Sequence, residues 1–150
     1  MGELNPYGSD PKFALFPHPR TASGNRLREI VGLTDVAYLK FLTRVNLCSG
    51  KWSADQARVS ARSLRDEGDH EVIVLLGAKV CSAFGGPPTF QIERGLDARF
   101  VTLPHPSGLC RAWNEEGSVD RARAVLTSAA PWVPWGMTSA REELTTGGVA

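Results

Sequence analysis

Apolar positions along the chain follow two different patterns, one typical of strands and the other of helices. Three apolar, β-branched runs predict strands, at 43–48, 71–76 and 99–103. After Glu71 the second run is continuously apolar (Val-Ile-Val-Leu-Leu), which is typical of a parallel strand with both faces buried. The stretch 2–4 predicts the end of a further strand.

Helical spacing of apolar residues separates these runs. The predicted helices begin near Thr21 or Ser23 and end at Gly32, and then span about 34–40, 53–66, 78–84 and 118–129. The pattern Ser53-Ala-Asp-Gln56 is a capping box, in which a side-chain oxygen accepts from a free helical N–H. Ser118 is expected to cap the last helix in the same way.

Strands that alternate with helices predict the α/β class. We expect a three-layer α/β/α sandwich around a parallel sheet of about four strands. A chain of 150 residues is enough for one domain. We assign residues 1–129 to that domain. Residues 130–150 begin with Ala-Pro-Trp-Val-Pro-Trp-Gly and then become polar, and we expect them to form a loosely ordered C-terminal tail.

The composition is that of a globular protein, with 42% hydrophobic and 22% charged residues. No apolar run approaches the ~20 residues that span a bilayer, and no secretory signal pattern is seen, so no membrane partner is expected. The net charge of +1 does not by itself indicate a nucleic-acid partner. Three widely spaced cysteines argue against a disulfide framework and favour a reducing cytosol.

Residues 100–111, Phe-Val-Thr-Leu-Pro-His-Pro-Ser-Gly-Leu-Cys-Arg, join a strand to a tight turn. In open α/β sheets, ligands bind outside the carboxyl ends of the strands. Asn5, Asn46 and His105 each lie at such a predicted end, so we expect them to line one cleft. The sequence shows neither a phosphate loop nor a nucleophile elbow, and its histidines lack metal-ligand spacing. No cofactor and no metal are therefore expected.

Several short motifs, taken in order, resemble the uracil-DNA glycosylase superfamily. Asn5-Pro6-Tyr7 is similar to the first motif of that family, and 103–111 is similar to the second. The mismatch-specific branch carries Asn-Pro-Ser-Gly-Leu-Ser-Arg where this chain has His-Pro-Ser-Gly-Leu-Cys-Arg. Further similarities are Phe-Pro-His-Pro at 16–19, Asn-Arg-Leu at 25–27, a strand at 44–48 and a strand with its helix at 72–85. The resemblance covers roughly residues 2–127.

Some positions depart from the family. Asn5 stands where the uracil-specific branch has Asp, which implies slower chemistry. The family has a strand before the first motif, of which only residues 1–4 are present here, so the first strand is expected to be truncated. The iron–sulfur branches use four cysteines and this chain has three, so no cluster is expected.

The resemblance implies a monofunctional DNA glycosylase of base excision repair. Such an enzyme hydrolyses the N-glycosidic bond of uracil, or of a related damaged or mismatched pyrimidine, after flipping the base out of the DNA stack, and leaves an abasic site. DNA is the implied partner, through the flipped base and the phosphates, and the protein would act as a monomer. It would be cytoplasmic, in a bacterial or phage-type cytosol, and associated with the nucleoid when acting.

The resemblance also assigns roles to residues. Asn5 would orient the attacking water and His105 would stabilise the departing base as an anion. The implied base-binding residues are Asn46, Tyr7 and Phe16, and the implied DNA-binding residues are Ser107, Gly108, Leu109 and Arg111.

Each residue also has a simpler interpretation. Asn before Pro is typical of a turn, Asn46 can be a satisfied core amide, and Phe16 and Tyr7 can be core residues. Leu109 can be a buried loop anchor, and Arg111 a solvated surface cation. Two other functions stay open: a catalytically silent relative that binds nucleic acid or a base, and a hydrolase of free nucleosides.

Overall fold

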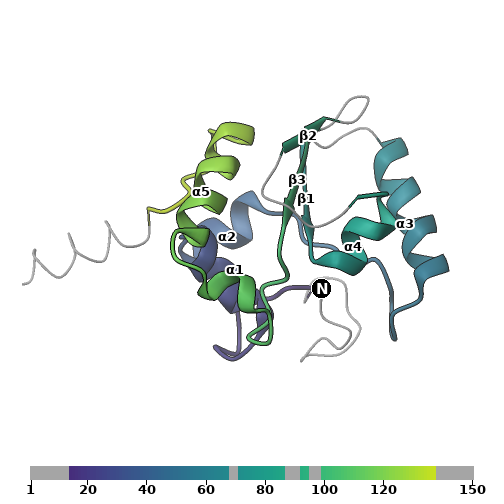
Figure 1. Cartoon of the computed structure of the whole chain (residues 1–150), viewed down its shortest axis with the longest axis horizontal. Coiled ribbons are helices and arrows are strands. Elements are labelled where there is room, and N and C mark those ends of the chain that lie inside the picture. Colours follow the sequence, from purple (N-terminus) through teal and green to yellow (C-terminus); the bar gives the residue numbers. More distant parts are fainter. Residues whose placement is uncertain (1–13, 68–70, 87–91, 95–98, 138–150) are drawn as a thin grey trace, which may run out of the picture.

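The computed structural model describes residues 14–67, 71–86, 92–94 and 99–137 (Figure 1). In chain order the elements are α1 (Ser23–Val31), α2 (Asp35–Phe41), α3 (Ala54–Glu67), β1 (Val72–Leu76), α4 (Ala78–Ala83), β2 (Ile92–Arg94), β3 (Arg99–Leu103), the 3₁₀ helix η2 (Arg111–Asn114) and α5 (Ser118–Ala129). The α/β class is therefore confirmed.

The sheet is mixed. Its strand order is β1-β3-β2. The central pair, β1 and β3, is parallel, with a register that runs from Val72 opposite Arg99 to Leu76 opposite Leu103. The short strand β2 pairs antiparallel with β3. Among the described residues the sheet thus has three strands, where we expected about four in one direction.

The predicted strand at 43–48 is wrong. Residues 42–46 have no regular secondary structure and residues 47–50 form bends. Leu47 and Cys48 are nevertheless buried, beside Ala57 and Ala61 of α3. The apolar pattern therefore reflects burial, while a strand also needs a hydrogen-bonded neighbour. The expected strand end at 2–4 lies outside the described residues.

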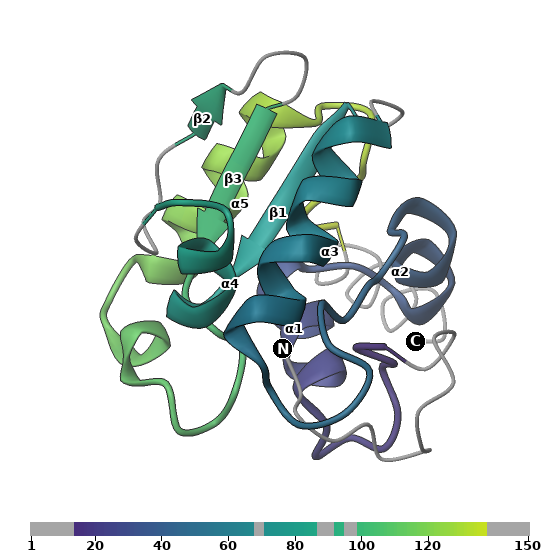
Figure 2. The same ribbon diagram turned by 90° about the vertical axis from the view of Figure 1, so that its right-hand side faces the viewer.

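Helices cover both faces of the sheet. Figure 1 shows α1, α2 and α5 on one side of the strands and α3 and α4 on the other, and Figure 2 shows the same arrangement after a quarter turn. Side chains along a strand alternate between its two faces. Accordingly Leu76 and Val101 belong to the core cluster with α1 and α5, whereas Leu75 and Phe100 belong to the cluster with α3 and α4.

The helix caps agree with the sequence only in part. The Gln56 N–H donates to Ser53 Oγ over 3.3 Å, as in a capping box, but the Gln56 side chain donates to Ser49 Oγ instead of returning to Ser53. Ser118 is not a cap, because Gly117 is the residue before α5 and Ser118 is its first residue. Ser118 is buried and its hydroxyl donates to the Trp113 carbonyl oxygen over 3.3 Å.

Residues 130–137 are not loosely held. Ala130 and Val133 are buried in the core, and the Gly136 N–H donates to the Val31 carbonyl oxygen over 2.9 Å. A Cβ added at Gly32 would lie 2.4 Å from the Gly136 Cα, so the two backbones are in direct contact. The domain thus extends at least to residue 137, and residues 138–150 lie outside the described part. No helix among the described residues is long and apolar enough to cross a membrane.

Candidate functional site

The loop 104–111 starts at the carboxyl end of β3, beside the end of β1. Because the two strands are parallel and Leu76 is opposite Leu103, β1 and β3 both end at the same side of the sheet, that of their carboxyl ends. The Gly77 N–H donates to the Leu103 carbonyl oxygen over 2.9 Å. This bond joins the turn into α4 to the start of the loop, as expected for a strand-end site.

His105 packs directly on Gly77. Gly77 has φ +87° and ψ 167°, a backbone conformation that is essentially restricted to glycine. A Cβ added there would lie 3.0 Å from the His105 Cβ and 3.4 Å from its Cδ2. The absence of a side chain at Gly77 therefore makes room for the imidazole at the edge of the sheet.

The hydrogen bonds of His105 define its tautomer. The Ser107 N–H donates to His105 Nδ1 over 3.0 Å. A neutral imidazole that accepts at Nδ1 carries its proton on Nε2, so Nε2–H is the donor. Nε2 is itself buried. The Trp113 indole N–H fixes the backbone at the same residue by donating to the His105 carbonyl oxygen over 3.0 Å.

The tip of the loop presents an apolar side chain to solvent. The Leu109 N–H donates to Ser107 Oγ over 3.1 Å, and the Cys110 N–H donates to the Ser107 carbonyl oxygen over 3.0 Å. These bonds close a tight turn above the buried Pro106. Leu109 is 93% exposed. It is therefore not a buried loop anchor, and its exposure has no explanation in the packing of the domain.

Two arginines lie at or near this turn. A Cβ added at Gly108 would lie 3.6 Å from Arg26 Nη1, so the Arg26 guanidinium sits against the loop tip. Its side chain makes no hydrogen bond or ion pair with the described residues. Arg111 is exposed at the start of η2. Arg26 was not among the predicted DNA-binding residues, although the Asn-Arg-Leu motif that contains it could have indicated it.

Asn46 and Phe16, two of the predicted base-binding residues, lie in different segments of the chain. Asn46 lies in the irregular segment 42–48, and its Oδ1 is buried without a hydrogen-bond partner among the described residues. The Phe16 ring lies 5.7 Å from the Arg44 guanidinium and 5.9 Å, edge-on, from the His18 ring. Asn5 and Tyr7 lie outside the described residues.

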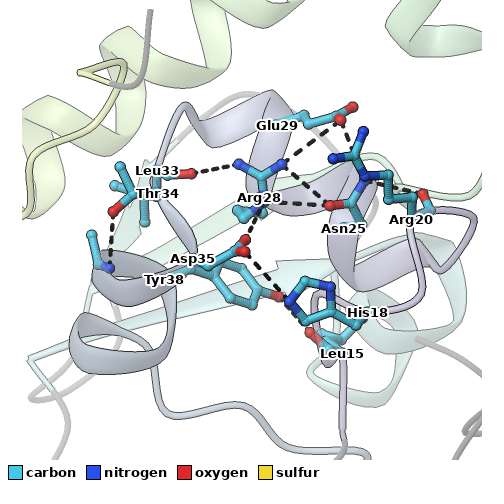
Figure 3. A network of polar contacts seen from close by, with 11 residues as sticks. Leu15, His18, Arg20, Asn25, Arg28, Glu29, Leu33, Thr34, Asp35 and Tyr38 are labelled. Atoms are coloured by element: carbon cyan, nitrogen blue, oxygen red, sulfur yellow. Dashed lines mark hydrogen bonds and ion pairs between the residues drawn. The ribbon is translucent and has the colours of Figure 1, made fainter. Parts of the chain in front are cut away.

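A polar network holds the loop that carries Phe16 (Figure 3). Arg28 donates to the Leu33 carbonyl oxygen over 2.9 Å and pairs with Asp35 over 3.0 Å. It also donates to the Asn25 side chain, and Asp35 contacts His18 over 3.4 Å. Asn25 and His18 of the resembling motifs therefore have structural partners on α1 and α2.

Two further contacts fix the same loop. The Tyr38 hydroxyl donates to the Leu15 carbonyl oxygen over 2.7 Å. Burial raises the pKa of Tyr38 above its usual range, although the nearby Arg44 and Arg28 charges oppose this shift. A Cβ added at Gly24 would lie 2.2 Å from the carbonyl oxygens of Leu15 and Phe16, so the start of α1 touches the loop backbone.

The described residues contain no group of three or more His, Cys, Asp or Glu side chains that could hold a metal ion. The chain was also compared with protein-family models, curated proteins and solved structures. None of these three comparisons finds a match.

Proposed function

We propose that the protein is a DNA glycosylase that hydrolyses the N-glycosidic bond of uracil, or of a related damaged or mismatched pyrimidine, and leaves an abasic site. The observation that supports this most is the loop 104–111. It combines a neutral imidazole, held as an Nε2–H donor, with a fully exposed leucine at its tip. The order of the motifs that resemble the uracil-DNA glycosylase superfamily supports the same activity.

The chemistry needs a donor for an anion. When the bond between the sugar C1′ and the pyrimidine N1 breaks, N1 keeps the electron pair, so the base leaves as an anion and the sugar becomes cationic. A preorganised N–H beside the O2 of the base stabilises that anion without reorganising during the reaction. The Ser107 N–H keeps His105 in the required tautomer. Water then bonds to C1′ and gives up a proton, which neutralises the departed base anion, and we assign the orientation of this water to Asn5.

Recognition of the base requires an acceptor and a donor on one side chain. An amide offers both, which fits N3–H and O4 of uracil. Asn46 is our candidate because its Oδ1 is buried and accepts no hydrogen bond from the described residues. Phe16 is the candidate for stacking on the base, and Tyr7 for excluding the 5-methyl group of thymine.

DNA contact is assigned to the loop tip. Flipping a base costs a few kcal/mol of stacking and pairing, and an apolar side chain inserted into the gap offsets part of that cost. Leu109 is our candidate for this role, and its exposure on a closed turn supports the assignment. Phosphates would be bound by Ser107, the Gly108 backbone and the arginines Arg26 and Arg111, which fix register without reading sequence. Such an activity belongs in a compartment that holds DNA, the bacterial or phage-type cytosol.

The test uses oligonucleotides that carry U:G, U:A, T:G, single-stranded uracil, hypoxanthine or 5-hydroxymethyluracil, followed by alkaline cleavage at abasic sites. Excision of at least one pyrimidine supports the proposal. Salt-dependent DNA binding with no cleavage of any substrate would instead identify a catalytically silent relative. Cleavage of free nucleosides, with DNA left intact, would identify a nucleoside hydrolase.

A further inference from the structure

An aromatic residue and a cation meet where the loop before α3 contacts α4. The Lys79 ammonium lies 5.8 Å from the centroid of the Trp52 ring. Trp52 belongs to the loop and Lys79 to the helix, so the contact joins two separate parts of the chain. Lys79 is exposed and Trp52 is half-buried, so solvent reaches both side chains. We name these two residues the Trp52–Lys79 pair.

The pair lies at the same end of the sheet as His105. Gly77, which packs on His105, follows β1 and directly precedes α4, and Lys79 comes two residues later. Figure 2 shows α4 and the start of α3 at the carboxyl end of β1. The nucleotides that flank a base held beside His105 would therefore lie on the side of the domain that carries the pair.

Hydrogen bonds and packing hold the loop that carries Trp52. The Ser53 N–H donates to Cys48 Sγ over 3.4 Å, and the Gln56 side chain donates to Ser49 Oγ over 3.2 Å. Trp52 itself packs against the core cluster between the sheet and α3 and α4. The indole is therefore a fixed platform at the surface.

The charges around Trp52 suit a phosphate backbone. Lys51, which precedes Trp52 in the chain, is an exposed cation like Lys79. Asp55, the first acidic residue after Trp52, is paired with Arg58 of its own helix. Exposed cations around an aromatic ring are the pattern that binds single-stranded nucleic acid, in which bases stack on the ring and phosphates contact the cations.

We propose that the Trp52–Lys79 pair binds one unpaired nucleotide of single-stranded DNA next to the flipped base. The base stacks on the Trp52 indole and the Lys79 ammonium contacts the phosphate. In the structure the ammonium is close to the ~6 Å limit of cation–π contacts, which are weak at exposed sites. The flexible lysine side chain can therefore leave the ring to the base and turn to the phosphate.

This nucleotide contact favours single strands over duplexes. In a duplex the flanking bases stay stacked on one another, whereas in a single strand their faces are open to an indole. Leu109 is assigned the opposite preference, because a wedge acts on stacked DNA. The inference rests on the proposed function for the place of the DNA strand, so its test measures binding of DNA that contains no uracil.

The test measures the affinity of the full chain for a labelled oligothymidylate of about 16 nucleotides, by fluorescence anisotropy at several salt concentrations. Trp52→Leu keeps an apolar side chain on the core cluster and should weaken binding about ten-fold, as for loss of one stacked base. Lys79→Gln should also weaken binding. It should reduce the slope of log affinity against log salt by about 0.7, the value for one phosphate contact on a single strand.

Two matched variants serve as controls. Trp132→Leu removes a tryptophan that is 53% exposed and follows the end of α5. Lys40→Gln removes a lysine of α2 that also lies over an aromatic ring, that of Phe41, at 5.4 Å. Figure 1 shows α2 and α5 on the opposite face of the sheet from α4. Both control variants should bind the oligothymidylate like the unchanged chain.

Weaker binding by both pair variants, with both controls unchanged, supports the proposal even if the chain excises no base. Failure of the unchanged chain to bind oligothymidylate would overturn it. An unchanged affinity and salt slope in Lys79→Gln would also overturn it, and this variant decides if Trp52→Leu does not fold, because Lys79 is exposed. Equal losses in the control variants would overturn it as well. In each of these three cases excision of uracil by the unchanged chain would leave the proposed function intact.

Discussion

The substitution Gly77→Ala tests whether the turn between β1 and α4 positions His105. Gly77 has φ +87° and ψ 167°, so any other residue there is strained, at a cost of roughly 1–3 kcal/mol. The new Cβ would also lie 3.0 Å from the His105 Cβ, which is tight enough that the histidine must shift by a few tenths of an ångström. The variant should therefore lose stability and also displace the imidazole.

Gly85→Ala is the matched control. Gly85 has φ +93°, and a Cβ added there meets nothing within 4 Å. It has strained backbone like Gly77, at the other end of the same helix, but does not touch His105. The difference between the two variants isolates the contact with the histidine.

The assays are urea unfolding, followed by tryptophan fluorescence, and single-turnover base excision. Both variants should lose about 1–3 kcal/mol of unfolding free energy. Only Gly77→Ala should also lower the excision rate, by about ten-fold, because small misplacements of a reacting group are costly. Equal excision rates in the two variants would refute the role of Gly77 in positioning His105.

Other predictions follow from single contacts. Leu109→Ala should change the unfolding free energy by less than about 0.5 kcal/mol, because the side chain is 93% exposed. The variant should nevertheless excise the base more slowly from duplex DNA and not from single-stranded DNA. An equal effect of the substitution on both substrates would count against a wedge. Tyr38→Phe should cost about 1–2 kcal/mol in urea unfolding by removing the bond to the Leu15 carbonyl oxygen. Because the folded-state pKa of Tyr38 is raised, the stabilisation that its hydroxyl provides is complete below the unfolded value of about 10 and declines above it. The difference in unfolding free energy between the unchanged chain and Tyr38→Phe should therefore be smaller at alkaline pH than at neutral pH, and an equal difference at both would contradict this. Side-chain ¹⁵N NMR should find His105 as the Nε2–H tautomer, and an Nδ1–H signal would be incompatible with the Ser107 bond.

Much of the layered fold follows from sequence periodicity. The continuous apolar run of β1 and the helical spacing in α1 and α3 predicted elements that the structure confirms within a few residues. The segment 43–48 shows the limit of this reasoning, because it has a buried apolar pattern and no strand partner. Residues 130–137 show another limit, since their packing depends on two glycine backbones, Gly32 and Gly136, that meet only in three dimensions.

The sequence predicted where the candidate site lies in the fold, but not the contacts within it. The Pro-His-Pro-Ser-Gly-Leu sequence indicated a turn at a strand end, and parallel pairing placed that turn beside Gly77. The tautomer of His105 and the position of Arg26 depend on particular hydrogen bonds and contacts, which spacing alone does not specify. Asn25 belongs to a resembling motif, but its side chain is occupied by Arg28.

The most direct test of the proposed function is single-turnover release of free uracil from DNA, measured with DNA affinity for the unchanged chain and for His105→Ala. The account predicts base release by the unchanged chain. In the variant the rate should fall by about 100-fold or more, as for loss of a transition-state donor, while DNA affinity stays nearly constant. Absence of free uracil with the unchanged chain, or equal losses of rate and affinity in the variant, would contradict the account.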